Sequence, residues 1–380
     1  MFTEQDFEDI RPYHDDEINA ALQRIVAVPE FGKILGFLFP DRDGSNIIAA
    51  LKQIHSALEF QKQFMHPLVN SIVRKTSHGL TTSGFENLVP GTPYLFVSNH
   101  RDIVLDSAML QVVLLDFGHL TSEITFGSNL MINQFIIDLG KVNRMFKVYR
   151  GGNRMELFRN SKLLSAYIRH TITNKRTSAW IAQRNGRTKD GNDKTESGLL
   201  KMFNISSAGD FDESFILLNI VPLAVSYEYE PCCDLKVKEM GFVAKGMPYV
   251  KEPNEDFLSI LSGITKPKGR IHLSACTPIN ELLPQTGGID VYNDRINKLA
   301  ALIDAEVYKH YKLWPTNYIA SDILNKVDHY AHYYTEAEKL SFLAYMEQEL
   351  SRLGNTEPIH TELLLKIYAT PVNNAESVGL

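Results

Sequence analysis

Residues 98–106, Ser-Asn-His-Arg-Asp-Ile-Val-Leu-Asp, place one histidine close to two aspartates. A carboxylate inside an apolar segment is costly unless it is ion-paired or hydrogen-bonded. Asp106 lies in such a segment, and its candidate partners in sequence are His100 and Arg101. A histidine whose tautomer is held by an aspartate is the arrangement that general-base catalysis needs. The alternative is a structural histidine beside Asp102, acting as a helix cap.

A second group of side chains could bind phosphate. Arg150 follows an apolar strand, and a glycine-containing loop further along the chain carries Arg184, Arg187 and Lys189. The planar fork of arginine suits phosphate oxygens. The loop is not a P-loop, because Asn192 stands where that motif requires lysine. We therefore expect an oxyanion cradle of a different kind.

The net charge of −6 conceals a local excess of positive charge. Between Lys141 and Lys189 there are 13 basic residues and one acid, Glu156. Such a region on an acidic protein steers an anionic ligand to one face, while a solvated helix surface is the simpler explanation for residues 154–176. No nucleic acid partner is expected, because interleaved aromatic residues are lacking and the whole chain repels polyanions. The basic residues are Lys141, Arg144, Lys147, Arg150, Arg154, Arg159, Lys162, Arg169, Lys175, Arg176, Arg184, Arg187 and Lys189.

The composition is that of an ordinary globular protein, with 44% hydrophobic and 22% charged residues in a chain of 380. The acidic N-terminus does not resemble a signal peptide, and the longest near-apolar stretch, residues 215–227, is too short to span a membrane. The three cysteines lack Cys-x-x-Cys spacing, so a reducing cytoplasm is expected. His329 and His332 have no third ligand nearby, so we expect no metal ion.

Helices are expected at both ends of the chain, in residues 1–79 and 289–380. The N-terminal region should contain one helix from about 45 to 73, and residues 371–380 should be a frayed tail. The short aromatic-rich segment 31–39 could lie on a bilayer surface. A contact with the protein core is the simpler explanation.

Between these regions strands alternate with helices, which predicts an α/β domain over residues 80–288. Its sheet should be mixed and largely parallel, with helices on its faces. Ligands bind outside the carboxyl ends of strands in such sheets, and His100, Arg150 and the loop of Arg184 all follow predicted strands. We therefore expect them at one edge. The predicted strands are 81–85, 94–98, 123–127, 146–150, 178–182, 219–227 and 270–276.

Four short blocks between residues 84 and 226 resemble the glycerolipid acyltransferases, which include the glycerol-3-phosphate and 1-acylglycerol-3-phosphate acyltransferases. The first is Asn99-His100 followed by an aspartate. Five residues separate His100 from Asp106 where the commonest form has four, which leaves Asp106 and Asp102 as alternatives for the orienting carboxylate.

The other three blocks follow in the family's order. One ends an apolar strand at Arg150, and the next places Arg187 and Lys189 at its two cations, with Arg184 where the family has glutamate. The last is an apolar strand interrupted by Pro222.

The resemblance implies an O-acyltransferase of phospholipid biosynthesis, with His100 as base and Asp106 or Asp102 as its carboxylate. The donor would be acyl-CoA or acyl carrier protein and the acceptor 1-acylglycerol 3-phosphate, with glycerol 3-phosphate or another lyso-lipid as alternatives. No metal or redox cofactor is implied. Peripheral contact with the cytoplasmic face of the inner membrane is expected. A thioesterase or a non-catalytic lipid-binding protein of the same fold are the other hypotheses. The implied substrate-binding residues are Asn99, Arg101, Arg150, Arg184, Gly186, Arg187, Lys189 and Pro222.

Overall fold

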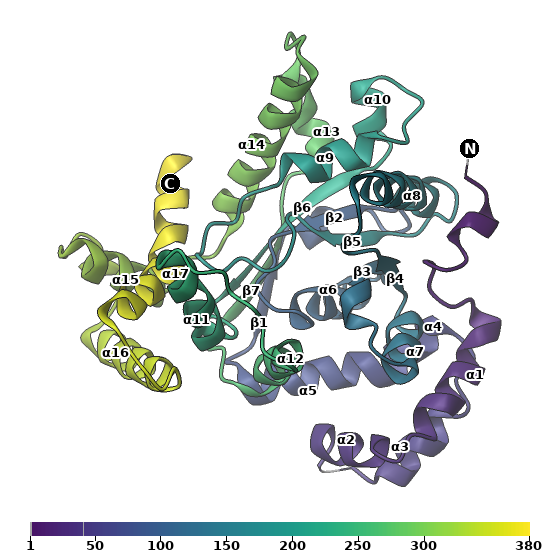
Figure 1. Cartoon of the computed structure of the whole chain (residues 1–380), viewed down its shortest axis with the longest axis horizontal. Coiled ribbons are helices and arrows are strands. Elements are labelled where there is room, and N and C mark those ends of the chain that lie inside the picture. The colour runs from purple at the N-terminus through teal and green to yellow at the C-terminus, as the bar shows by residue number, and fades with distance from the viewer. Residues whose placement is uncertain (1, 41) are drawn as a thin grey trace.

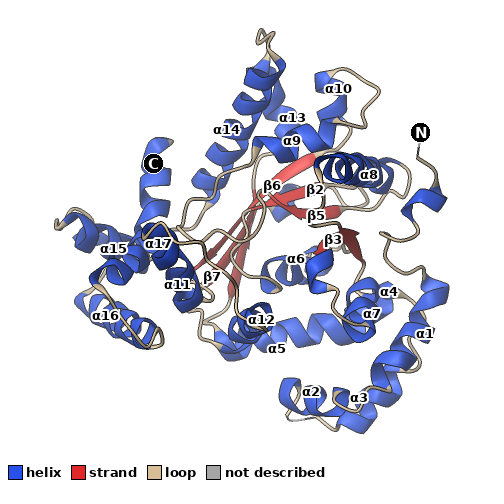
Figure 2. Ribbon diagram, in the orientation of Figure 1, coloured by secondary structure: helices blue, strands red, loops and turns tan. Residues whose placement is uncertain are grey.

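The computed structural model describes residues 2–40 and 42–380, and within them it shows a seven-stranded sheet with helices on both faces (Figures 1 and 2). The strand order is β1-β7-β6-β2-β5-β3-β4. Neighbouring strands are parallel except β6 and β7. The predicted α/β class with a mixed, largely parallel sheet is confirmed. The strands are β1 (Leu80–Ser83), β2 (Leu95–Ser98), β3 (Glu123–Gly127), β4 (Met145–Val148), β5 (Ala179–Ala182), β6 (Ile220–Tyr227) and β7 (Ile271–Ala275).

Every predicted strand overlaps an observed one, because the central strands are short apolar runs bounded by turns. All residues of β2 and β6 are buried, as expected of parallel strands covered on both faces. Alternate residues of β2 serve two cores. Leu95 and Val97 pack on one face, and Phe96 packs on the other.

The helices on each face of the sheet pack against it and form a hydrophobic core with it. One core contains Tyr167 and Leu299, and the other contains Val69 and Met109. In Figure 1, α8 and α12 lie on opposite sides of the strands. The first face is covered by α8 (Arg154–Thr173), α9 (Ser197–Asn204) and α14 (Tyr292–His310), and the second by α5 (His66–Thr76) and α6 (Leu105–Asp116).

The N-terminal region is helical, but the single helix predicted from 45 to 73 is wrong. The helix ends at Leu51. After it, the carbonyls of Lys52 and Ile54 accept hydrogen bonds from Asn19 Nδ2, each at 2.9 Å. A side chain from α1 therefore satisfies two of the backbone acceptors at the break. The helices here are α1 (Asp15–Val26), α2 (Phe31–Leu38), α3 (Gly44–Leu51), α4 (Ala57–Phe60), the π-helical turn Gln61–Met65 and, later, α7 (Gln134–Val142).

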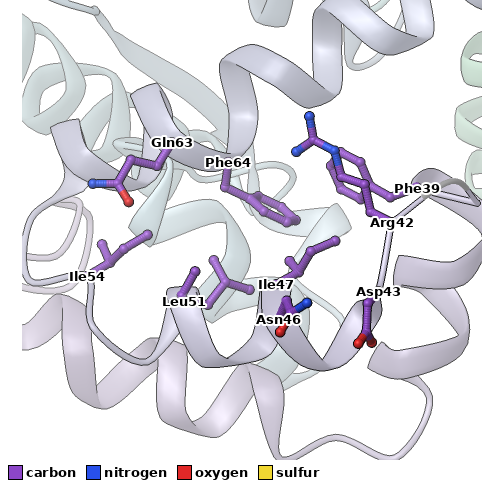
Figure 3. Close-up of a pocket in the computed structure, with 10 residues that line it drawn as sticks. Phe39, Arg42, Asp43, Asn46, Ile47, Leu51, Ile54, Gln63 and Phe64 are labelled. Atoms are coloured by element: carbon purple, nitrogen blue, oxygen red, sulfur yellow. The ribbon is translucent and has the colours of Figure 1, made fainter.

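The aromatic-rich segment 31–39 forms a core contact as its simpler explanation required. Phe31 and Leu35 of α2 are buried, while Phe37 is exposed. A hollow of about 390 Å³ lies beside α3 in this helical region (Figure 3). It is lined by Phe39, Arg42, Asp43, Asn46, Ile47, Ala50, Leu51, Ile54, Gln63 and Phe64, and so it is separate from the residues around His100.

The C-terminal region packs on the edge of the site, and the predicted frayed tail is wrong. Pro371, Val372 and Ala375 are buried in α17 (Pro358–Ser377). The backbone of Ile367 in this helix lies so close to Gly191 that a side chain at 191 would clash with it. The tail is therefore ordered by packing. The neighbouring helices are α11 (Cys233–Ala244), α12 (Glu255–Thr265), α15 (Pro315–Asn325) and α16 (Glu336–Ser351).

In the part of the chain that the structure describes, no helix has both the length and the apolar character needed to cross a bilayer. The division at residues 79 and 288 stays a prediction. The remaining helical elements are α10 (Phe211–Ile216), α13 (Ile279–Leu282) and the 3₁₀ turns Glu4–Phe7, Phe85–Asn87, Ser128–Leu130, Leu283–Thr286 and Ala331–Tyr333.

Candidate active site

His100 lies in the turn between β2 and α6, at the carboxyl end of a central strand. Its Nδ1 is 2.9 Å from Asp106 Oδ2 in the first turn of α6. An ionised carboxylate only accepts hydrogen bonds, so Nδ1 carries the proton and donates it. The ring meets Trp180 edge-on, with 5.6 Å between the ring centroids. Because the turn and α6 directly follow β2, both the histidine and Asp106 lie at one edge of the sheet.

Asp106 is buried but well supplied with donors. Besides His100, its Oδ2 accepts the backbone N–H groups of Arg101 at 2.6 Å and Asp102 at 2.9 Å. Its Oδ1 accepts the hydroxyl of Tyr227 at 2.7 Å. Burial raises the pKa of Asp106, but the hydrogen bonds from His100 and Tyr227 outweigh it, and the pKa lies below its ordinary value. The carboxylate stays ionised and holds the imidazole.

Of the two aspartates, Asp106 is the one hydrogen-bonded to the histidine ring, while the hydrogen bonds of Asp102 within the described residues go to backbone N–H groups. Its Oδ1 accepts the N–H groups of Val104 at 2.9 Å and Leu105 at 2.8 Å, at the start of α6. Its Oδ2 is buried against Gly263 and has no hydrogen-bond partner among the described residues. Burial, followed by the nearby charge of Asp106, raises the pKa of Asp102.

The other ring nitrogen, Nε2 of His100, makes no hydrogen bond to any residue in 2–40 or 42–380. The imidazole side chain is 14% exposed. With the proton on Nδ1, the lone pair of Nε2 is free to accept a proton from a bound molecule. The pair therefore has the geometry that a general base needs.

Arg101 is a correction to the predicted substrate-binding set. Its guanidinium is buried between Asp193, at 2.6 Å, and Glu230, at 3.2 Å, and it lies over the ring of Tyr311. Lys236 pairs with Glu230 from the other side, at 2.5 Å. Because its charge is already neutralised inside the protein, Arg101 is not available to a substrate phosphate.

Asn99 and Pro222 also lie beneath the site. Asn99 exchanges two hydrogen bonds with the backbone of Val225 in β6, at 2.8 and 2.9 Å, and donates to Asp193 at 2.9 Å. Pro222 is buried inside the sheet opposite Val97. Both are placed to support the turn of His100 and not to contact a ligand.

The cationic loop 183–189 lies beside the histidine turn. The backbone N–H of Thr188 donates to the carbonyl of His100 at 2.7 Å. Arg187 Nη2 donates to Ser259 in α12 at 3.2 Å, while its buried Nη1 has no partner in the described part of the chain. Lys189 is ion-paired with Glu239. Gly186 adopts φ +78°, a backbone conformation that favours glycine.

Arg150 reaches the same loop from β4. Its guanidinium hydrogen-bonds Asn185, and with Arg184 it borders a cavity of about 280 Å³. The inner wall of this cavity is apolar and includes Ile181, Leu164 and Met202. Arg150 and Arg184 thus share one cavity, while Arg187 turns toward α12; all three follow the carboxyl ends of β4 and β5.

Sequence reasoning missed the partners that complete the site. These partners are Tyr227, Asp193 and Glu230, which lie far from His100 in the sequence. One signal was present in the sequence, at Asp106, because a carboxylate buried in an apolar helix needs hydrogen-bond donors. The structure finds no cluster of three His, Cys, Asp or Glu side chains suited to a metal ion within residues 2–40 and 42–380. His329 and His332 contact neighbouring tyrosine rings near the surface.

No protein-family model matches this sequence, and no curated protein matches it. Similar solved structures include the 1-acyl-sn-glycerophosphate (LPA) acyltransferase PlsC from Thermotoga maritima, with 13% sequence identity and a TM-score of 0.37 over 78% of this chain and 97% of that chain.

Proposed function

We propose that the protein is an O-acyltransferase that moves an acyl group from a thioester to the hydroxyl of a phosphorylated glycerol or lysophospholipid. The observation that carries the proposal is the pairing of His100 Nδ1 with the buried Asp106, in a turn that is hydrogen-bonded to the cationic loop through Thr188. The sequence blocks around these residues, which resemble those of the glycerolipid acyltransferases, support the same reaction.

In the proposed reaction Nε2 of His100 takes the proton from the acceptor hydroxyl as its oxygen attacks the thioester carbonyl. Asp106 stabilises the imidazolium that forms. The C–S bond then breaks, and the imidazolium returns its proton to the departing thiolate, so a free thiol and an oxygen ester are the products. Fixing the hydroxyl in line with the carbonyl supplies much of the rate enhancement.

Direct transfer is favoured over a covalent enzyme intermediate by the side chains near His100. Ser98 is buried, and its hydroxyl donates to the carbonyl of Asn99 at 2.6 Å. Cys232 is also buried, its Sγ contacts the carbonyl of Ser259, and burial raises the pKa of its thiol. Neither is an activated nucleophile.

The acceptor phosphate would be held by Arg150 and Arg187, with Lys189 adding charge by exchanging Glu239 for the ligand. Arginine binds phosphate through paired hydrogen bonds, and the unpartnered Nη1 of Arg187 is already desolvated for that purpose. We favour 1-acylglycerol 3-phosphate as acceptor, with acyl-CoA or acyl carrier protein as donor. A lipid-derived acceptor would place the protein at the cytoplasmic surface of a membrane.

The test is acyl transfer from a labelled acyl thioester to 1-acylglycerol 3-phosphate, glycerol 3-phosphate or water. Wild type should form an acylated product, and His100→Ala should lower the rate by about 10²–10⁴-fold. His329→Ala, at an exposed histidine, is the matched control and should leave the rate unchanged. Release of free fatty acid at the same rate without acceptor would instead identify a thioesterase.

A further inference from the structure

The first turns of α8 carry an unusual outward face. Met155, Phe158, Arg159 and Lys162 follow the spacing i, i+3, i+4, i+7, which places all four on one side of a helix. Met155 is 82% exposed and Phe158 is 60% exposed. Large apolar side chains that are exposed to solvent next to basic residues are typical of a surface that binds a partner molecule. We call these four residues, together with Arg154, the α8 face.

The cations of the α8 face are free to meet an anionic partner. Within residues 2–40 and 42–380, Arg154, Arg159 and Lys162 form no ion pair. The acids Glu156 and Asp6 each accept a backbone N–H at a helix start, from Asn153 and Thr3 respectively. The face also belongs to the most basic stretch of an acidic chain. Its charge therefore selects an anionic surface.

A second apolar surface, at the end of α11 and the start of α12, differs in charge. Val250 is 79% exposed and Phe257 is 62% exposed. Its lysines are already paired, Lys245 with Glu357 and Lys251 with Asp256. Because these charges are neutralised within the chain, this surface has no preference for an anionic partner.

We propose that the α8 face docks onto an anionic lipid bilayer. An amphipathic helix with basic residues beside exposed Phe and Met lies in the membrane interface, where the cations meet anionic headgroups and the apolar groups enter the boundary of the acyl chains. This replaces the simpler explanation of a solvated helix surface. The inference deepens the proposed function and rests on it for its purpose, which is to bring a lipid-derived acceptor to the site.

Docking there would leave the site uncovered. Leu157 lines the cavity whose border includes Arg150 and Arg184. It follows Met155 by two residues, so it projects from the other side of α8. A bilayer on the α8 face would therefore not cover this cavity.

The test is co-sedimentation of the full chain with vesicles of phosphatidylcholine mixed with phosphatidylglycerol, and with vesicles of phosphatidylcholine alone. We expect binding to the anionic vesicles that weakens as salt rises. Each cation at such a surface is worth about fivefold in affinity, so Arg159→Gln with Lys162→Gln should lower affinity about 25-fold. Met155→Ser with Phe158→Ser should lower it at least tenfold.

Two controls distinguish membrane binding by the α8 face from catalysis and from non-specific hydrophobic binding. His100→Ala should bind vesicles as wild type does, so a failed acyltransferase assay leaves this measurement intact. Val250→Ser with Phe257→Ser is the matched apolar variant and should bind unchanged. The proposal is overturned if folded wild type binds no anionic vesicle, if it binds both vesicles equally and without salt dependence, or if only the Val250 and Phe257 variant loses binding.

Discussion

The backbone N–H of Thr188 donates a 2.7 Å hydrogen bond to the carbonyl oxygen of His100. The Thr188 hydroxyl donates in turn to Asp193, at 2.7 Å, and Asp193 also accepts from Asn99 and Arg101. The turn that carries His100 and the loop that carries Arg184, Arg187 and Lys189 are thus tied to one buried carboxylate. Their separation is fixed before any ligand binds, which is the condition for efficient positioning.

Asp106→Asn should abolish most of the acyl transfer, while Asp102→Asn should not. An amide at 106 removes the negative charge that stabilises the imidazolium and presents the wrong partner to Nδ1, so kcat should fall about 10²–10⁴-fold. At position 102 an asparagine oxygen can still accept the two N–H groups at the start of α6, and kcat should stay within about tenfold of wild type. Steady-state kinetics on both variants checks this, with circular dichroism to show that both are folded. Equal loss in the two variants would contradict the assignment of Asp106.

Arg187→Gln should raise the KM for a phosphorylated acceptor and leave the KM for the acyl donor unchanged. A lost charge-assisted hydrogen bond costs about 1.5–3 kcal/mol, which is about 10- to 150-fold in affinity. Lys201→Gln, at an exposed residue of α9, is the control and should change neither constant. An effect on the donor KM alone would show that the loop binds the thioester instead.

Arg101→Met should destabilise the protein. Removing the guanidinium leaves Asp193 and Glu230 as buried charges without their main partner, a change that costs about 3–5 kcal/mol. Arg159→Met removes an exposed arginine and should change stability by less than about 0.5 kcal/mol. Denaturant unfolding of the two variants measures the difference. Equal stabilities would mean that the buried network is replaced at little cost by methionine.

Asp304→Asn should stabilise the protein at neutral pH. Burial raises the pKa of Asp304 to about 6, and its Oδ1 accepts the N–H of Thr195 at 2.7 Å, a bond that asparagine can also accept. A raised carboxyl pKa means that the folded state binds the proton more tightly, so wild-type stability falls as pH rises from about 4 to 6 and then stays constant. The gain in the variant should be at most about 3 kcal/mol above pH 7 and vanish near pH 4. Thermal melts across this range test the sign.

The sequence predicted the central strands well because β2, β5 and β6 are mostly apolar runs bounded by turns. It also pointed to a partner for Asp106, since a carboxylate in an apolar helix needs one. It could not choose between Asp102 and Asp106. That choice depends on which of the two carboxylates accepts the backbone N–H groups at the start of α6 and which one accepts from His100. The role of Arg101 was likewise out of reach. Its acids, Asp193 and Glu230, come from distant segments and are visible only in the folded chain.

The helix predicted from 45 to 73 failed for a related reason. Its apolar spacing was helical throughout, yet the break after Leu51 is stabilised by Asn19 from another helix. The buried end of α17 was missed because the last residues of a chain are usually poorly ordered. Tertiary packing overrode local preference in both places.

The packing of α17 has a consequence for the order in which the contacts around His100 can form. The hydroxyl of Tyr368 accepts the backbone N–H of Glu230 at 2.8 Å, and Glu230 holds Arg101 next to His100. Gly191, in the loop just after the cations, is pressed against Ile367. During synthesis the segment that carries His100 leaves the ribosome long before the segment that braces it. The turn of His100 would therefore lack the support that Tyr368 and Ile367 supply until α17 has been synthesised.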